Sequence, residues 1–157
     1  MNNPEIMHQA IAKAQSTMRR NIGGPFGAAI VDPNGKVIAI ASNTVLGDND
    51  PTAHAEMNAI RIASAYLGTH DLSGCTLYAT GYPCPMCLSA IIWANIKKVY
   101  YGCTPQDADE IGFRDDFIYD FINSGCKDGR ILELTESNRA ECLELFKEYQ
   151  DTDKELY

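Results

Sequence analysis

The spacing of apolar residues predicts a helix and a hairpin at the start of the chain. Residues 4–20 carry apolar side chains at helical intervals, which predicts an amphipathic helix: Ile6, Met7, Ala10, Ile11, Ala14 and Met18. The apolar runs 26–31 and 36–41 flank Asp32-Pro33-Asn34-Gly35. This turn-forming sequence predicts two antiparallel strands. A polar loop then leads into a predicted helix at 52–67, which Gly68 ends.

From residue 75 onward, the apolar pattern predicts strands that alternate with helices. The predicted strands are 75–80, 97–102 and 130–134, and the predicted helices are 83–96, 115–122 and 138–149. Such alternation is typical of parallel strands with helices on both faces of the sheet. The predicted fold class is therefore α/β, a three-layer α/β/α sandwich with a mixed sheet of about five strands.

Length and charge limit the class of protein. With 157 residues, of which 45% are hydrophobic, residues 1–157 are expected to form a single domain. The formal net charge of -8 argues against nucleic acid as a partner, because such binding depends on Lys and Arg that neutralise phosphates. No stretch approaches the roughly 20 apolar residues of a membrane span. We expect a soluble, cytoplasmic protein without a membrane partner, which acts on a small molecule.

Four residues form a split metal-binding pattern. His54 and Glu56 precede a Pro-Cys-Pro-Met-Cys run that contains Cys84 and Cys87, and each pair is predicted to lie in the first turn of a helix. Two thiolates and one imidazole suit Zn²⁺, and three protein ligands leave a position for water, as in a catalytic site. Zinc-bound water loses its proton at a pKa of about 7. The pattern predicts one catalytic zinc per chain, with Glu56 as the group that carries protons.

Each of these residues also has a simpler interpretation. A Cys-x-x-Cys pair alone could be a redox pair or two core cysteines, and His54 could be a buried histidine. Glu56 could be a solvated glutamate that interacts favourably with the N-terminal end of the helix dipole. The other four cysteines lack ligand spacing and are expected to be small buried or neutral residues: Cys75, Cys103, Cys126 and Cys142. The combination of both motifs favours the zinc site.

The spacing of the motifs resembles that of a known enzyme superfamily. A His-x-Glu pair followed by Pro-Cys-x-x-Cys is similar to the signature of the cytidine deaminase-like superfamily. Within it, residues 23–28, 49–56, 83–88, 112–119 and 154–157 most resemble those of bacterial guanine deaminases. The resemblance implies hydrolysis of guanine to xanthine and ammonia. In that reaction hydroxide on zinc attacks C2, and Glu56 passes protons to the ring nitrogen and to the departing amine.

The resemblance also implies a set of substrate-binding residues: Phe26, Asn43, Ala55, Trp93, Asp115 and Tyr157. Asn43 would hydrogen-bond the purine, Asp115 would accept from its exocyclic amine, and Phe26 and Trp93 would stack on it. Simpler roles stay open: an Asx turn for Asn43, a helix cap for Asp115, and core packing for both aromatic residues.

The C-terminal segment has a further implied role. In the proteins that the chain resembles, two subunits form a homodimer in which the C-terminal segment of one closes the site of the other. The resemblance therefore implies that residues 138–157, a helix and a tail, are swapped between subunits and that Tyr157 reaches the neighbouring site. A frayed terminus is the simpler expectation for a last residue.

One departure affects the choice of substrate. Gly81-Tyr82 stands before the Pro-Cys pair, where many relatives have an acidic residue directly before it. A deaminase of another free base or of a nucleoside, such as cytosine, guanosine or an aminopurine, is therefore an alternative. A tRNA adenosine deaminase would need a basic surface, and the chain has 13 Lys plus Arg against 21 Asp plus Glu. A noncatalytic thiol pair is the remaining alternative.

Overall fold

The computed structural model describes all residues, Met1–Tyr157, and divides into two compact units, Met1–Asp115 and Asp116–Tyr157. The first unit holds a four-stranded sheet in the order β2-β1-β3-β4. The strands are β1 (Gly27–Val31), β2 (Val37–Ser42), β3 (Thr76–Gly81) and β4 (Lys98–Cys103). Strand β1 is antiparallel to both of its neighbours, whereas β3 and β4 are parallel. The predicted mixed sheet is confirmed, with four strands where about five were expected.

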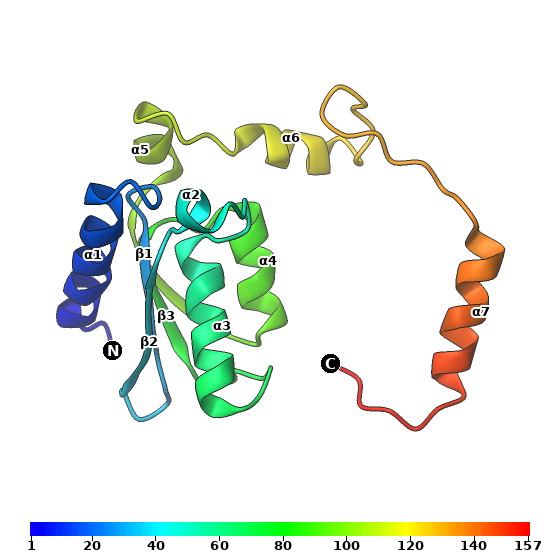
Figure 1. Ribbon diagram of the computed structural model, residues 1–157, viewed down its shortest axis with the longest axis horizontal. Coiled ribbons are helices and arrows are strands. Elements are labelled where there is room, and N and C mark those ends of the chain that lie inside the picture. The colour runs from blue at the N-terminus through cyan, green and yellow to red at the C-terminus, as the bar shows by residue number, and fades with distance from the viewer. The chain divides into compact units, whose positions relative to one another are not determined.

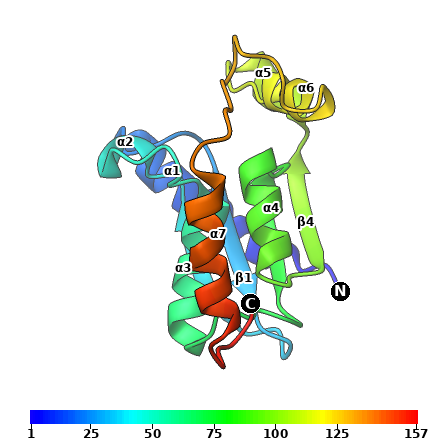
Figure 2. The same cartoon turned by 90° about the vertical axis from the view of Figure 1, so that its right-hand side faces the viewer.

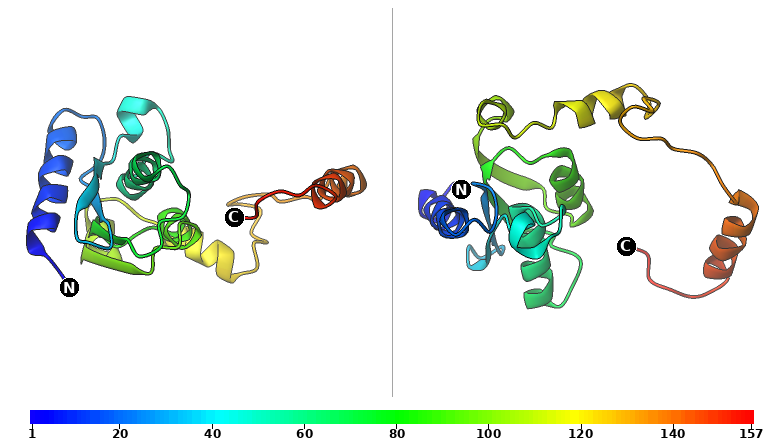
Figure 3. Two further views of the ribbon diagram at one scale, coloured as in Figure 1. Left: turned by 90° about the horizontal axis from the view of Figure 1, so that it is seen from below. Right: turned by 45° about the horizontal axis from the view of Figure 1, so that its top comes forward.

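Helices cover both faces of this sheet. Helix α1 (Pro4–Arg19) packs against β1, β2 and β3, and α3 (Ala55–Leu67) packs against β1 and β2 from the opposite side (Figure 1). Helix α4 (Pro85–Trp93) connects the parallel strands β3 and β4 and lies beside α3. In Figure 3, α1 in blue and α3 in green flank the strands. The predicted three-layer α/β/α arrangement is confirmed.

The central strand β1 is buried along its whole length. Ala28 and Ile30 belong to the core cluster on the α3 side, and Ala29 and Val31 belong to the cluster on the α1 side. A strand that is buried on both faces reads as a continuous apolar run. This is why residues 26–31 show no alternation of polar and apolar residues, although a strand forms there.

The structure differs from the predicted elements at three places. Two short helices were not predicted, α2 (Val45–Asp48) and α5 (Pro105–Glu110). The predicted strand at 130–134 was wrong, because that segment pairs with no strand. A turn at Asp128 replaces it: the Asp128 carbonyl accepts from the N–H of Ile131 at 3.0 Å, and its carboxylate accepts from the Arg130 guanidinium at 2.9 Å.

The second unit contains α6 (Asp116–Asn123) and α7 (Arg139–Gln150), which confirm the last two predicted helices. Phe121 is its one buried residue, with 9% of its surface exposed, and no residue of α7 is buried. No helix of the chain combines the length and the apolar character that crossing a bilayer requires.

Candidate active site

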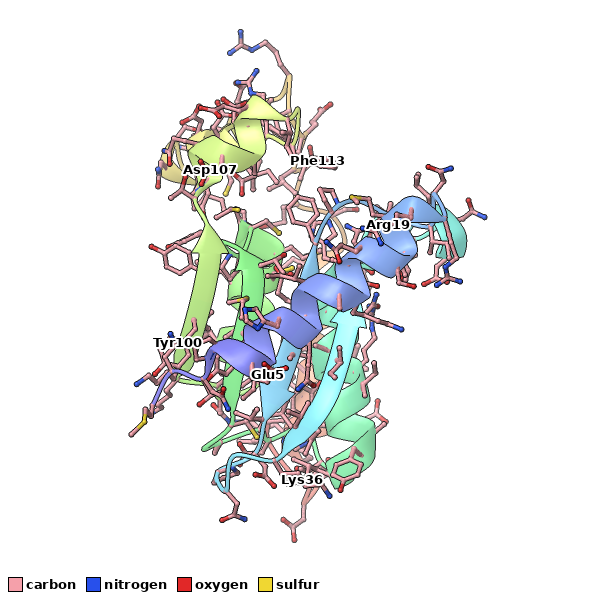
Figure 4. All side chains as sticks on the ribbon, turned by 90° about the vertical axis from the view of Figure 1, so that its left-hand side faces the viewer. Glu5, Arg19, Lys36, Tyr100, Asp107 and Phe113 are labelled. Atoms are coloured by element: carbon pink, nitrogen blue, oxygen red, sulfur yellow. The ribbon has the colours of Figure 1, made fainter.

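One end of the sheet gathers residues from three strands. The register pairs Gly27 at the start of β1 with Ser42 at the end of β2, so that the residues just outside the strands, Phe26 and Asn43, become neighbours. The Asn43 N–H donates to the Phe26 carbonyl at 2.9 Å. Gly81 is the last residue of β3 and lies at this same end of the sheet. Figure 4 shows Phe113 at this end and Lys36, in the hairpin turn, at the opposite end.

Helices α3 and α4, which lie side by side in Figure 2, also begin at this end. His54 is the N-cap of α3 and Cys84 is the N-cap of α4, both with extended backbone, and Cys87 lies in the first turn of α4. His54 and Cys84 thus precede their helices, whereas the sequence placed both inside a first turn. The structure brings all three predicted ligands together at this place.

The distances between the three ligand atoms match a tetrahedral zinc site. The His54 Nδ1 lies 3.5 Å from the Cys84 Sγ and 3.6 Å from the Cys87 Sγ, and all three atoms lie within 4.8 Å of one another. Zinc bonds of about 2.3 Å to sulfur and about 2.0 Å to nitrogen, at a tetrahedral angle, would separate those ligand atoms by about 3.6 Å. The residues present therefore fit zinc.

The protonation of this group also suits a cation. The pKa of Cys84 falls to about 4, because the Cys87 thiol donates a hydrogen bond to its sulfur and His54 adds a second interaction. The pKa of Cys87 is raised, since this thiol keeps the proton that the two sulfurs share. The Cys84 thiolate in turn raises the pKa of His54. A metal ion would displace the retained proton on binding.

Glu56 lies beside the ligand atoms without belonging to the metal-binding group. Only 7% of its surface is exposed. Burial raises the pKa of its carboxyl group, and an interaction with the nearby Cys87 side chain opposes that rise. The side chain lines the same cleft as His54 and Cys84, which is where a proton carrier for a metal-activated water has to be.

A cleft of about 680 Å³ opens in front of this group. Three of the predicted substrate-binding residues line it, namely Phe26, Asn43 and Asp115. The Asn43 side chain is fixed, because its Oδ1 accepts from the Val45 N–H at 3.0 Å. Its Nδ2 donates to no protein group. The Asx-turn interpretation and the substrate-binding interpretation are therefore compatible, since each uses a different end of one amide.

The cleft also contains residues that sequence reasoning missed. The ring of Phe113 meets the ring of Phe26 edge to face, with centroids 5.0 Å apart. Short helices supply others: Val45 and Leu46 from α2 and Ala108 from α5. The one signal in the sequence was that Phe113 lies within residues 112–119, a segment that resembles guanine deaminases. Tyr82 lines the cleft as well, and its ring meets that of Tyr101 edge to face at 4.9 Å.

Three of the predicted substrate-binding residues do not line the cleft of this chain. Ala55 is fully buried behind His54 in the first turn of α3. Trp93 ends α4, at the opposite end from Cys84, and 73% of its surface is exposed. Tyr157 belongs to the second unit and is 89% exposed. Contacts of these residues with a substrate stay predictions.

Comparison with known proteins establishes the family. Residues 1–103 match the family described as the cytidine and deoxycytidylate deaminase zinc-binding region. The chain belongs to this deaminase family. It therefore has the cytidine deaminase-like fold and is a zinc-dependent deaminase, as the motifs predicted, with His54, Cys84 and Cys87 as the group able to bind the metal.

Several relatives within this deaminase family can be compared along their length. Guanine deaminase of Bacillus subtilis is 46% identical over 131 residues, which cover 83% of each chain. The X-ray structure of guanine deaminase from Bacillus subtilis matches with a TM-score of 0.91 and 40% identity, over 100% of this chain and 99% of that one. A tRNA-specific adenosine deaminase of Agrobacterium fabrum is 44% identical over 97 residues, which are 62% of each chain.

Proposed function

We propose that this deaminase hydrolyses guanine to xanthine and ammonia. The observation that carries the proposal is the likeness to guanine deaminase of Bacillus subtilis along the whole chain, including the part beyond residue 103 where the family match ends. The relative that acts on tRNA is similar over a shorter stretch. Reaction chemistry depends on the shared zinc-binding region, whereas substrate choice depends on the residues around it.

The chain's own residues perform the proton transfers. Zinc held by His54, Cys84 and Cys87 would lower the pKa of a bound water to about 7 and so supply hydroxide at neutral pH. The Glu56 carboxylate takes the proton that this water loses. Glu56 passes this proton to the ring nitrogen next to C2. It then takes the second proton of the same water molecule and delivers it to the amino group, which leaves as ammonia when its bond to C2 breaks. Guanine and water are thus converted to xanthine and ammonia without another reactant.

The cleft supplies the contacts that a flat, polar base requires. Phe26 offers an aromatic surface, and the edge-to-face contact with Phe113 holds its ring in place. The Asn43 Nδ2 offers a donor, which suits a carbonyl or ring-nitrogen acceptor of the base. Asp115 offers a carboxylate acceptor for an amino group. A volume of about 680 Å³ lies in the usual range of sites for small ligands.

Ammonia release from a panel of bases and nucleosides tests the proposal directly. The zinc-loaded protein should release ammonia from guanine faster than from cytosine, adenine or guanosine. Glu56→Ala should abolish the release while it keeps one zinc per chain, and Glu110→Ala, an exposed glutamate outside the cleft, should behave like the wild type. Faster release of ammonia from a different base would contradict guanine as the substrate, but the protein would still be a deaminase.

We also infer that two copies of the chain form a homodimer. Helix α7 has no buried residue, and its apolar side chains are exposed, Leu145 by 64% and Phe146 by 69%. Ile92 and Trp93 of α4 are exposed by 67% and 73%. A helix of about 12 residues is marginal in water unless an apolar face is covered, and a second copy offers another such face. Analytical ultracentrifugation should therefore give twice the 17.3 kDa mass of the chain.

The proposed compartment is the cytoplasm. All six cysteines are free, and three of them are exposed or half-buried outside the metal group: Cys103, Cys126 and Cys142. Free thiols are typical of a reducing compartment.

A further inference from the structure

A second cavity, of about 440 Å³, lies along the edge strand β2. On one side it is lined by Lys13, Thr17 and Arg20, which recur at helical spacing along α1 and directly after it. On the other side it is lined by Asn58, Arg61 and Ile62 of α3. The cavity thus sits between the two helical layers and contains none of the metal-binding residues.

The two cavities share a wall. At the end of β2, Asn43 lines the active-site cleft, whereas its neighbours Ser42 and Thr44 line the second cavity. The Asn58 amide fixes this wall, because its Nδ2 donates to the Ser42 carbonyl and to the Thr44 hydroxyl, both at 2.9 Å. The second cavity therefore lies directly behind the strand end that carries Asn43.

The second cavity concentrates positive charge in an acidic protein. Lys13, Arg20 and Arg61 line it, although the chain has a net charge of -8. None of these three cations has a carboxylate within ion-pair distance. Arg20 donates to the Ser16 carbonyl at 3.2 Å, and Arg61 donates to the Asn58 Oδ1 at 3.3 Å. Neutral partners hold the guanidinium groups, so their charges are not compensated.

One carboxylate also lines the cavity and is already engaged. Asp48 accepts a hydrogen bond from the Thr44 hydroxyl at 2.5 Å. Asp50 lies close enough to Arg61 to be influenced by its charge, but it does not line the cavity. Three cations against one carboxylate leave an excess of positive charge at this place.

A buried hydroxyl without a partner lies in the same cavity. Ser42 has 2% of its surface exposed, and its Oγ makes no hydrogen bond with the protein. Buried polar groups nearly always have a partner, and an unpaired one costs free energy. Thr17, which is also buried, differs because its hydroxyl donates to the Ala14 carbonyl at 3.3 Å. The Ser42 hydroxyl therefore keeps a donor that no protein group uses.

We propose that this second cavity binds the phosphate group of a small molecule. A phosphate oxygen suits both needs of the site, because it accepts from a hydroxyl and from guanidinium or ammonium groups. The remaining lining is apolar, from Ile22, Ile40 and Ile62, and suits the carbon skeleton of a phosphate ester. A neutral or cationic ligand would leave the three positive charges uncompensated.

Calorimetric titration of the full-length, zinc-loaded protein tests the proposal without turnover, so that its failure is distinct from a failure of the deaminase assignment. Inorganic phosphate and ribose 5-phosphate serve as probes at constant ionic strength. We expect one saturable site per chain. The double variant Lys13→Gln, Arg20→Gln should bind at least tenfold more weakly, about 1.4 kcal/mol. Arg19→Gln, which removes a neighbouring charge on α1 outside the cavity, should bind like the wild type.

A second variant tests the floor of the cavity. Ser42→Ala removes a hydroxyl that has no partner, so the protein without ligand should melt at the same or a higher temperature while phosphate binds more weakly. Tighter binding of ribose 5-phosphate identifies an ester as the ligand, and equal binding identifies the free anion. Absence of saturable binding, or equal affinity in the double variant and in Arg19→Gln, would overturn the proposal.

Discussion

At the scale of single residues, we propose that the oxygen of the Asn43 amide serves the fold and that its nitrogen binds the substrate. Its Oδ1 accepts from the Val45 N–H, whereas its Nδ2 donates to no protein group and is left for the base. Asn43→Asp keeps the acceptor for Val45 but presents a negatively charged acceptor to the base. We expect kcat/KM for guanine to fall by about 100-fold, since a buried polar contact becomes a repulsive one.

Steady-state kinetics checks the Asn43 prediction, and thermal melting controls for folding. Because the contact with Val45 survives, the melting temperature of Asn43→Asp should stay close to that of the wild type. A melting temperature that falls together with the activity would mean that Asn43 serves only the fold. The simpler Asx-turn interpretation would then be sufficient.

Gly23 supports the same amide through its lack of a side chain. A Cβ at this position would lie 2.0 Å from the Asn43 carbonyl oxygen and 2.5 Å from its Oδ1. Gly23→Ala must therefore displace Asn43, and we expect a loss of about 1–3 kcal/mol in the free energy of unfolding. Urea unfolding measures that loss. Gly129→Ala is the matched control, because a Cβ there meets no atom within 4 Å; an equal effect in both variants would contradict the prediction.

The residues that could be predicted from the sequence are those whose chemistry is fixed by local spacing. The ligands His54, Cys84 and Cys87 were found because they belong to two short motifs, His-x-Glu and Cys-x-x-Cys. Zinc also accepts few types of ligand, which narrows the choice of residues. Phe113 was missed, since an aromatic residue in a loop has no local mark of where it packs. Its contact with Phe26 joins residues that are far apart in sequence.

At the scale of elements, the metal group joins two helix starts. His54 caps α3, and Cys84 caps α4, and neither cap has a hydrogen bond from its side chain to the helix. Zinc would therefore add a direct link between two helix ends, beyond the contacts of His54 with the two cysteines. A chelator should lower the melting temperature, because zinc at 1,000 times its Kd stabilises the folded chain by about 4 kcal/mol.

Paired cysteine variants test the metal prediction. Cys84→Ser should lose zinc and melt at the lower temperature of the chelated protein. Cys103→Ser, which alters an exposed cysteine outside the metal group, should retain one zinc per chain and the wild-type melting temperature. Zinc content by mass spectrometry and differential scanning calorimetry measure both effects. Full zinc content in Cys84→Ser would remove that residue from the ligand set.

Length decided which elements could be predicted. Helices α1, α3 and α7 span 12 to 16 residues, and the apolar pattern or the capping residues marked each of them. Helices α2 and α5 span four and six residues, too few for a period to appear. The segment 130–134 carries strand-forming residues, but Asp128 turns the chain and no neighbouring strand is present to pair with it.

At the scale of the whole molecule, the second unit lacks a core of its own. Asp116–Tyr157 buries only Phe121, whereas the first unit buries two clusters on the two faces of its sheet. A segment of this size does not usually fold alone without further burial. The apolar pattern predicted the two helices there, but it could not show that their apolar side chains are mostly exposed in the single chain.

A mixing experiment tests whether the C-terminal tail acts on a second copy. Glu56→Ala has an intact tail but lacks the proton carrier, and a chain that ends at residue 153 has Glu56 but lacks Tyr157. Each variant alone should release little ammonia from guanine. If the tail closes the neighbouring site, the two variants expressed together should regain up to about a quarter of the wild-type activity, since random pairing completes one site in half of the dimers.

The outcome of mixing separates three structural alternatives by the same ammonia readout. Mixed dimers that remain inactive, although their formation is verified by a tag on each variant, would show that Tyr157 serves the site of its own chain. Wild-type activity in the shortened chain alone would show that the tail is a frayed terminus. Regained activity in the mixture requires both an intact Glu56 in one copy and an intact tail in the other. Only a site completed by two chains meets that requirement.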